Sequence, residues 1–421
     1  PVKMTPTGDG VWIYDMGTNF AGFVRVKIHD AQPGQKIVLR FAERLNPDGT
    51  IYTTNLRGAR ATDTYICRGG GTEVWQPRFT FHGFQYVELT GYSGKPGLDT
   101  ITGIELTSAT PVVGSFACSD PMANTLYRNV CQTQRANFID IPTDCPQRDE
   151  RLGWMGDAQI YVRTASFNTD VAAFFTKWMV DVEDAQLPNG GFSDVSPRKV
   201  AMDGGTAAWG DAGVICPWTI YQVYGDTQIL ARHYGAMQKW IDYCKETTKG
   251  TLLRPATGYG DWLSIQADTP KDVLATAYFA HSTKLVADIA KVLGKPDDAA
   301  RYQKLFDDIR KAFNTAYVSD DGTIKGDTQT VYVLALAFDL LPEAMRRPAA
   351  KRLVDNISAR QWHLSTGFVG TKDLMATLNA IGATDVAYHL FHNETFPSWG
   401  FSIQHGATSI WERWDGWTPE K

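Results

Sequence analysis

Residues 140 to 159, with the sequence DIPTDCPQRDERLGWMGDAQ, restrict the fold of this chain more than any other segment. They include five carboxylates, two arginines and a tryptophan, which is too polar for a core helix and too ordered in composition for a linker. Pro142 and Pro146 hold the backbone extended and disfavour helix at the residues before them. We therefore expect a stiff, acid-bearing loop that enters a helix near Asp157.

Crowded carboxylates on one loop affect one another's protonation. Each negative charge disfavours the next, and burial adds to the effect, so we expect one acid to stay protonated near neutral pH. A general acid needs this property. The alternative is a charge-laced turn in which Arg and Asp side chains only cap and cross-link helices.

The run DCPQRDERLGWMGD, residues 144 to 157, resembles the signature loop of the bacterial α-L-rhamnosidases, which are inverting glycoside hydrolases with an (α/α)6-barrel catalytic domain. The resemblance implies that Glu150 is the general acid and that Asp144 binds a sugar hydroxyl. It also implies that Arg148, Trp154 and Asp157 line the rhamnose pocket.

Composition excludes several classes of partner. A chain of 421 residues is longer than one hydrophobic core usually supports, which predicts two or more domains. A content of 43% hydrophobic and 21% charged residues is typical of a soluble globular protein. The net charge of -5 comes without any basic run, so we expect no nucleic-acid partner and no membrane partner. No apolar run reaches the roughly 18 residues that span a bilayer.

The cysteines and histidines predict neither a metal site nor a cofactor. The six cysteines form no CxxC pair and read as isolated thiols, and the histidines are dispersed without ligand spacing. The histidines are His281, His363, His389, His392 and His405, which we interpret as core or surface residues. No signal peptide is visible at the N-terminus, and the compartment and the oligomeric state stay open.

Residues 1–110 have the pattern of an antiparallel β-sandwich that serves as an accessory domain. Short β-branched or aromatic runs such as FVRVKI and KIVLRF alternate with turn signals such as NPDG and GGG. The segments GTNFAGFVRVKI and FTFHGFQYVEL resemble the sandwich that precedes the barrel in the rhamnosidases. Residues 111–119 are predicted to be a linker, and residues 120–421 the catalytic domain.

Helical periodicity begins at Asp120, with Pro121 in the first helical position. Ten further helices are predicted at 157 to 168, 170 to 187, 209 to 225, 226 to 247, 272 to 294, 296 to 316, 327 to 341, 342 to 360, 370 to 382 and 383 to 394. The pattern fits a toroid or an open solenoid, and the resemblance implies an all-α (α/α)6 toroid. Such a toroid has twelve helices, so the count of eleven predicts that the chain lacks its last helix, which would follow Trp417. We would then expect this piece to aggregate and to be nearly inactive.

Three long loops carry the remaining candidate residues. The first contains Asp194, Trp209 and Asp211, and the second contains Asp261 and Trp262. A tryptophan beside an aspartate suits a sugar, whose apolar face packs on the ring while hydroxyls bond the carboxylate. The third loop, HGATSIWERWDGW, resembles the family segment that supplies the catalytic base, which implies that role for Glu412. The alternative is an aromatic-rich helix start in which Glu412 pairs with Arg413.

The leading interpretation is an inverting exo-glycosidase that removes terminal α-L-rhamnose from a rhamnose-containing glycoside or polysaccharide. Glu150 would protonate the leaving oxygen and Glu412 would activate water, with their carboxyl groups ~6.5–9.5 Å apart. The predicted sugar-binding residues are Asp144, Arg148, Trp154, Asp157, Trp209, Asp211 and Trp262. Two alternatives remain, namely an (α/α)6-barrel hydrolase for another neutral or 6-deoxy sugar and a non-catalytic carbohydrate-binding protein.

Overall fold

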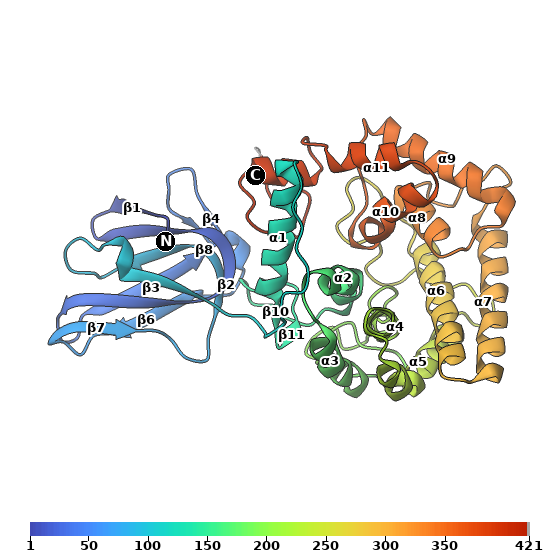
Figure 1. The fold of residues 1–421 in the computed structure, drawn as a ribbon, viewed down its shortest axis with the longest axis horizontal. Helices are drawn as coiled ribbons and strands as arrows, with labels where there is room; N and C mark the ends of the chain where they lie inside the picture. Colours follow the sequence, from blue (N-terminus) through green and yellow to red (C-terminus); the bar gives the residue numbers. More distant parts are fainter. Residues whose placement is uncertain (419–421) are drawn as a thin grey trace. The chain divides into compact units, whose positions relative to one another are not determined.

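A computed structural model describes residues 1–418 of the chain (Figure 1). The residues form two compact units. The strand-rich unit comprises Pro1–Ala109, Phe116–Leu152 and Ala407–Ile410, and the helical unit comprises Thr110–Ser115, Gly153–Gly406 and the residues from Trp411 onward. This spatial division does not follow continuous sequence, whereas the predicted boundaries at 110 and 120 do. Those boundaries therefore stay a prediction.

The strand-rich unit is built on a seven-stranded antiparallel sheet with the order β1-β2-β8-β3-β6, in which β7 and β9 also pair with β2. These strands are β1 (Lys3–Gly8), β2 (Val11–Ala31), β3 (Lys36–Ala42), β6 (Thr62–Ile66), β7 (Gly71–Trp75), β8 (His82–Thr90) and β9 (Ile101–Glu105). The short strands are β4 (Arg44–Leu45), β5 (Ile51–Tyr52), β10 (Phe138–Ile139) and β11 (Ile141–Pro142). The predicted antiparallel β-sandwich is confirmed.

Strand β2 organises this unit because its 21 residues change partners along their length. The register shifts between Asp15 and Phe20; the first half pairs with β1 and β8, and the second half pairs mainly with β9 and β7. Within the second half Val24, Val26 and Ile28 are buried at alternate positions, as the pleat of a strand requires. The unit also contains helix α1 (Pro121–Asn137), which Asp120 caps by accepting a hydrogen bond from the Met122 N–H.

The helical unit contains a ring of paired helices (Figure 1). Helices α2, α4, α6, α8 and α10 each contact the next in this order, and α10 contacts α2 again. Helices α5, α7, α9 and α11 each pack against the ring helix that precedes them in the chain, and α3 packs against α4 and α5. The bounds are α2 (Met155–Asn168), α3 (Ala172–Asp184), α4 (Ala212–Tyr224), α5 (Thr227–Thr247), α6 (Lys271–Val292), α7 (Pro296–Tyr317), α8 (Gln329–Ala337), α9 (Glu343–Ala359), α10 (Phe368–Ala380), α11 (Thr384–Phe391) and α12 (Trp399–Gln404).

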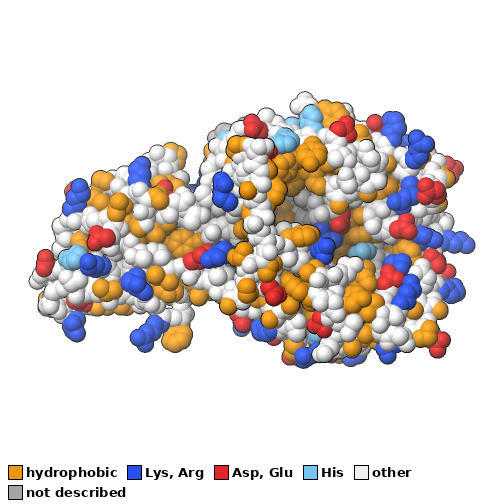
Figure 2. Space-filling view, viewed as in Figure 1, with side chains coloured by type: hydrophobic (Ala, Val, Ile, Leu, Met, Phe, Trp, Pro, Cys, Tyr) orange, Lys and Arg blue, Asp and Glu red, His pale blue; other side chains and the backbone are white. Residues whose placement is uncertain are grey.

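The sequences of these helices fit their places. Helix α8, with the sequence QTVYVLALA, is buried at all but one position because it is covered on every side. Helix α7 has one buried stripe, at Ala299, Tyr302, Phe306, Ile309, Phe313 and Tyr317. Its exposed face carries ion pairs such as Lys304–Asp308, and charges of both signs are interspersed over the visible face of this unit (Figure 2). None of the helices among the described residues combines the length and apolarity needed to cross a membrane.

The helix count corrects one expectation. All eleven predicted helices are present with ends shifted by a few residues, and residues 1–418 contain a twelfth, α12. This helix has six residues, of which Gly400 and Phe401 are buried, and is too short to show a periodic pattern. Twelve helices are consistent with the predicted (α/α)6 toroid. The prediction of a further helix after Trp417, and of aggregation in its absence, is not tested by this count and stays a prediction.

Candidate active site

The signature loop is closed on itself at its two ends. The Asp144 N–H donates to the Leu152 carbonyl at 3.0 Å, and the Leu152 N–H donates to Asp144 Oδ1 at 2.8 Å. The guanidinium group of Arg151 lies over the ring of Phe81, 4.4 Å from its centroid. These contacts fix residues 144 to 152 as the stiff loop that the two prolines predict.

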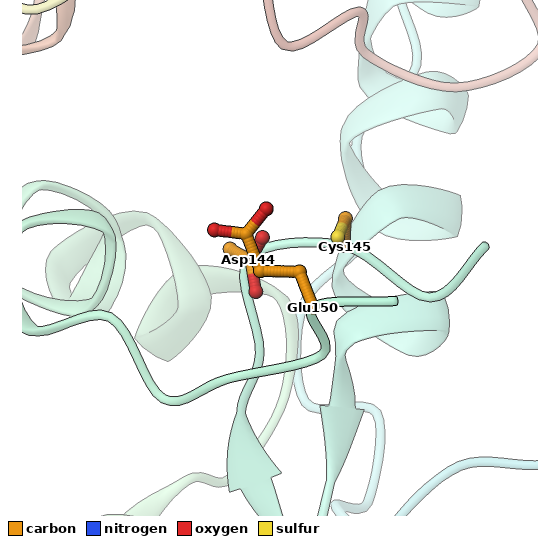
Figure 3. A group of neighbouring side chains, drawn as sticks. All are labelled: Asp144, Cys145 and Glu150. Atoms are coloured by element: carbon orange, nitrogen blue, oxygen red, sulfur yellow. The ribbon is translucent and has the colours of Figure 1, made fainter. Parts of the chain in front are cut away.

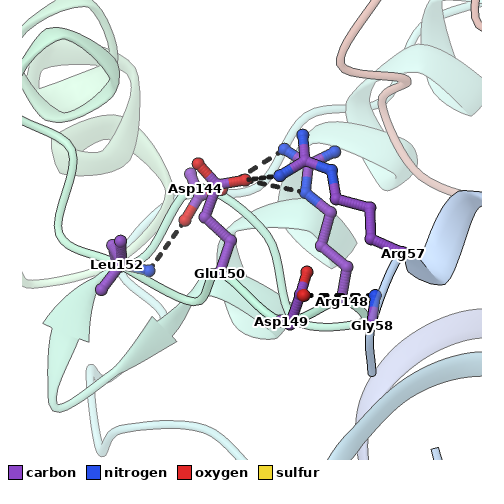
Figure 4. Close-up of polar contacts among 7 residues, drawn as sticks. All are labelled: Arg57, Gly58, Asp144, Arg148, Asp149, Glu150 and Leu152. Carbon is purple, nitrogen blue, oxygen red and sulfur yellow. Dashed lines mark hydrogen bonds and ion pairs between the residues drawn. The ribbon is translucent and has the colours of Figure 1, made fainter. Parts of the chain in front are cut away.

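Asp144, Arg148 and Glu150 lie together, as predicted (Figure 4). Glu150 Oε2 accepts hydrogen bonds from Arg148 Nε at 2.9 Å and from Arg57 Nη1 at 2.8 Å. Arg148 Nη2 also lies 3.6 Å from Asp144 Oδ2. The loop therefore presents two acids that face two guanidinium groups, one of which comes from a segment that the sequence did not indicate.

Asp144 has the protonation behaviour that we expected of one acid in this loop. Burial and, to a smaller extent, the negative charge of Glu150 raise its pKa, whereas hydrogen bonds from Cys145 and Leu152 and the charge of Arg148 lower it. The net effect raises the pKa from 3.8 to about 6. Apart from its ion-pair contact with Arg148, Asp144 Oδ2 has no hydrogen-bond partner among the described residues. This carboxyl group thus exchanges its proton near neutral pH.

Asp144, Cys145 and Glu150 also bring three atoms that can bind a metal within 4.8 Å of one another (Figure 3). A cysteine binds metals as the thiolate, but burial raises the pKa of the Cys145 thiol well above its usual value. Glu150 already accepts hydrogen bonds from two guanidinium groups. These groups fit an acid cluster better than a metal site.

Trp154 and Asp157 lie where the loop enters the helical unit. Trp154 pairs with Val195 through an isolated β-bridge, and the Met155 N–H donates to the Asp194 carbonyl at 2.9 Å. Helix α2 begins at Met155, so Asp157 lies in its first turn, where a carboxylate is favoured by the helix dipole. The predicted helix entry is confirmed.

The three predicted tryptophans surround a tyrosine. The ring of Tyr259 lies 5.9 Å from Trp154, 4.7 Å from Trp209 and 6.1 Å from Trp262, measured between ring centroids. Burial raises the pKa of Tyr259, whose hydroxyl donates to Asp194. Trp262 is 43% exposed, whereas Trp209 is 3% exposed. We call these four rings the aromatic cluster.

The aspartates near Trp209 and Trp262, namely Asp211 and Asp261, are hydrogen-bonded to other groups of the protein. Asp211 is fully buried and accepts hydrogen bonds from the Ala208 N–H, Trp240 Nε1 and Ser282 Oγ. Asp261 accepts from Thr330 Oγ1 and from the backbone N–H groups of Gly367, Val369 and Gly370, at the start of α10. A buried carboxylate needs such partners. The interpretation of Asp211 as a sugar ligand is therefore corrected to that of a residue that orders its loop.

Glu412 is exposed and belongs to the helical unit. Arg413 Nε donates to Asp415 Oδ1 at 2.8 Å, and the alternative in which Arg413 pairs with Glu412 stays open. Trp414 Nε1 donates to the Thr366 carbonyl at 2.9 Å and ties the segment to the helical unit. The role of Glu412 and its separation from Glu150 stay predictions.

Comparison with known proteins decides the family. The model of the bacterial α-L-rhamnosidase 6 hairpin glycosidase domain matches residues 111–421, and that of the bacterial α-L-rhamnosidase concanavalin-like domain matches residues 5–107. The chain belongs to the bacterial α-L-rhamnosidase family. It is 52% identical to an α-L-rhamnosidase of Streptomyces avermitilis over 418 residues, which cover 99% of this chain and 40% of that protein. It is 43% identical to an α-L-rhamnosidase of Formosa agariphila, covering 96% of this chain and 45% of that protein.

Solved α-L-rhamnosidase structures share the fold. The crystal structure of the Streptomyces avermitilis enzyme complexed with L-rhamnose matches 100% of this chain with a TM-score of 0.98 and 52% identity, over 40% of its own length. The structure of the α-L-rhamnosidase from Dictyoglumus thermophilum matches 98% of this chain and 48% of its own length, with a TM-score of 0.96 and 38% identity. The chain thus spans less than half the length of these relatives.

The sequence did not indicate two residues that contact the predicted ones. Arg57 follows a 3-10 turn, η1 (Thr54–Leu56), and lies 93 positions before Glu150, so no local motif connects the two. Tyr259 lies two residues before Asp261 in the second loop, but a tyrosine there is not distinguished by any pattern.

The histidines divide between the interior of the helical unit and an open hollow. The ring of His281 stacks on Phe338, and burial lowers its pKa to about 3. His363, His389 and His392 line one open hollow of about 700 Å³ at the end of α11, where the His389 ring stacks on Trp362. This hollow contains none of the predicted site residues.

Proposed function

We propose that this chain carries the catalytic part of an inverting exo-α-L-rhamnosidase that removes terminal α-L-rhamnose from glycosides or polysaccharides. The observation that carries the proposal is the cluster of Asp144, Arg148 and Glu150, which lies within the segment matched by the family's glycosidase domain. The names of the relatives, and the rhamnose complex of one of them, support the choice of sugar.

In the proposed mechanism Glu150 donates a proton to the glycosidic oxygen as the bond to the anomeric carbon breaks. Glu412 takes a proton from the water that attacks the opposite face of the sugar, which inverts the anomeric configuration. The two guanidinium groups at Glu150 Oε2 hold the acid in a fixed orientation. Preorganisation of this kind lowers the cost of reaching the transition state.

The remaining residues bind the sugar. Asp144, Arg148 and Asp157 supply charged partners for hydroxyl groups, which form stronger hydrogen bonds with charged groups than with neutral ones. The aromatic cluster, in which Trp262 is the more exposed of the two loop tryptophans, supplies flat apolar faces for the ring and for the 6-methyl group. We assign Asp211 to ordering the loop of Trp209.

A panel of aryl glycosides tests the proposal. We expect the aryl α-L-rhamnoside to be cleaved far faster than the β-D-glucoside, α-D-mannoside or α-L-fucoside. Preference for another sugar would identify the alternative barrel hydrolase. Binding of rhamnose without cleavage of any glycoside would identify a carbohydrate-binding protein.

NMR of the first sugar released tests the stereochemistry. Inversion of an α-L-rhamnoside gives β-L-rhamnose first, before mutarotation mixes the anomers. Initial formation of α-L-rhamnose would contradict the roles given to Glu150 and Glu412.

A further inference from the structure

The turn at Arg57 and Gly58 contacts the signature loop at two successive residues (Figure 4). Arg57 Nη1 donates to Glu150 Oε2 at 2.8 Å, and the Gly58 N–H donates to Asp149 Oδ2 at 3.2 Å. All four residues belong to the strand-rich unit. The turn therefore holds the segment that carries the proposed acid.

The backbone of this turn is built for close approach. Arg57 has φ 56°, a conformation that non-glycine residues rarely adopt and that often marks a functional position. The preceding Leu56 is buried and anchors the turn. A Cβ atom at Gly58 would lie 2.8 Å from Asp149 Oδ2, so only glycine lets the backbone reach that carboxylate without displacing it.

The two guanidinium groups at Glu150 differ in their surroundings. The Arg148 side chain is 12% exposed and also lies near Asp144, whereas the Arg57 side chain is 56% exposed. The charged and titratable groups near Glu150 include Arg57, Arg148, Asp144 and Cys145. Arg57 is thus a positive charge that can be removed while the contacts of Arg148 stay in place.

The chemistry of the guanidinium group decides where the proton of Glu150 lies. Arginine has donors and no acceptor, so a carboxyl oxygen that accepts from two guanidinium groups does not also carry an acidic proton. Both hydrogen bonds reach Oε2. In the proposed role of Glu150 as the acid, Oε2 is therefore not the oxygen that carries the proton.

We propose that Arg57 is a positioning residue for the general acid, which together with Arg148 occupies Glu150 Oε2, directs the proton to Oε1 and stabilises the carboxylate left after proton transfer. This inference depends on the proposed role of Glu150. It extends the machinery of the reaction to a turn within the residues matched by the concanavalin-like domain model.

The test measures kcat/KM for Arg57→Gln and Arg57→Lys in the full chain, with one aryl α-L-rhamnoside that has a poor leaving group and one that has an activated phenol. Arg57→Gln should lower kcat/KM about tenfold for the poor leaving group and less for the activated one. Arg57→Lys, which keeps the charge, should restore most of the rate on the poor leaving group.

Arg40→Gln is the matched control. Arg40 is also half-exposed and donates to a partly buried glutamate, Glu88, at 2.8 Å, but Glu88 lies on strand β8. This variant should keep the parent rates on both substrates. If Arg57→Gln behaves like Arg40→Gln while Glu150→Gln is impaired, the inference is overturned and the proposed function stands.

A second measurement does not need activity. The carboxyl carbon resonance of Glu150 in ¹³C-labelled protein, identified by its absence from Glu150→Gln, is recorded in the parent and in Arg57→Gln at one pH. The resonance should move in the variant, because one of the two guanidinium groups at Oε2 is lost. An unchanged resonance would overturn the inference. A parent that cleaves no rhamnoside would instead count against the proposed function.

Discussion

The half-buried carboxylates of the signature loop and the buried carboxylates of the helical unit are held in different ways. Asp211 and Asp261 accept hydrogen bonds from neutral N–H and O–H groups at both oxygens. Glu150 is instead held by the charged side chains of two arginines, and Asp144 keeps one oxygen without a hydrogen-bond partner among the described residues.

The difference separates structural acids from chemical ones. A carboxylate whose oxygens are all bonded to its own surroundings fixes a backbone and has no capacity left for a ligand. We infer that a carboxyl group held by charged side chains, or with an oxygen that lacks a hydrogen-bond partner among the described residues, can exchange a proton or bind a hydroxyl group. Asp211 and Asp261 each follow a glycine and lie within two positions of a tryptophan, whereas Asp144 lies between Thr143 and Cys145. Sequence context does not show which of these carboxyl groups is fully hydrogen-bonded, because the partners come from distant segments.

The substitution Glu150→Gln gives the strongest test of whether Glu150 is a proton donor and not a structural acid. If Glu150 is the acid, kcat for a glycoside with a poor leaving group should fall by ~10²–10⁴-fold, and an activated aryl glycoside should lose much less. Steady-state kinetics on the two substrates give the result. Glu88→Gln, which removes the other arginine-paired glutamate, is the control and should retain activity. Equal losses on both substrates would show that Glu150 is not the proton donor.

Glu412→Gln tests the other half of the mechanism. The attacking water is needed whatever the leaving group, so both substrates should slow alike, by a factor of about 10²–10⁴. Kinetics on the same pair of substrates make the comparison. Near-parent rates would show that Glu412 is structural and that the base lies elsewhere.

On the structural side of the comparison, Asp261→Asn should destabilise the fold by about 3 kcal/mol, because an amide NH₂ would face backbone N–H donors at the start of α10. Urea unfolding measures the change. Asp308→Asn, which breaks only an exposed pair on α7, should stay within about 0.5 kcal/mol. A stable Asp261→Asn variant with altered substrate binding would place Asp261 among the chemical acids.

The sequence predicted the helices because their apolar positions repeat over three turns or more, as Tyr302, Phe306, Ile309 and Phe313 do in α7. It missed α12, which is shorter than two turns. It identified Asp144, Arg148 and Glu150 because they share one short motif. It could not show that Asp211 is buried or that Arg57 reaches Glu150, since both facts depend on chain segments distant in sequence.

The pH dependence of stability tests whether the pKa of Asp144 is raised in the folded protein. Its pKa of about 6 in the fold exceeds the unfolded value of 3.8, so the folded state binds the extra proton between these pH values. Asp144 therefore makes its full contribution to the free energy of unfolding below pH 3.8, and this contribution is lost as the pH rises through 6. Asp144→Asn removes the effect, so the variant should gain about 2–3 kcal/mol relative to the parent between pH 4 and pH 7.

Urea unfolding of the parent and of Asp144→Asn at several pH values measures this difference, and titration of all other groups cancels between the two. A constant difference across the range would mean that the pKa of Asp144 is not raised. The variant should also lose activity, which distinguishes it from a substitution that only stabilises.

The smallest expected effect belongs to the aromatic cluster. Trp262 is 43% exposed, and its ring contributes stacking for a sugar but little to the core. Trp262→Ala should therefore raise KM for the aryl rhamnoside by about three- to tenfold, the size expected of one aromatic contact, while the free energy of unfolding changes by less than about 1 kcal/mol. Tyr388, an exposed aromatic residue on α11, is the matched control, and Tyr388→Ala should leave KM unchanged. An equal rise of KM in both variants would show that Trp262 makes no specific contact with the sugar. A loss of stability in Trp262→Ala without a rise of KM would show that its ring is structural, as the side chains of Asp211 and Asp261 are.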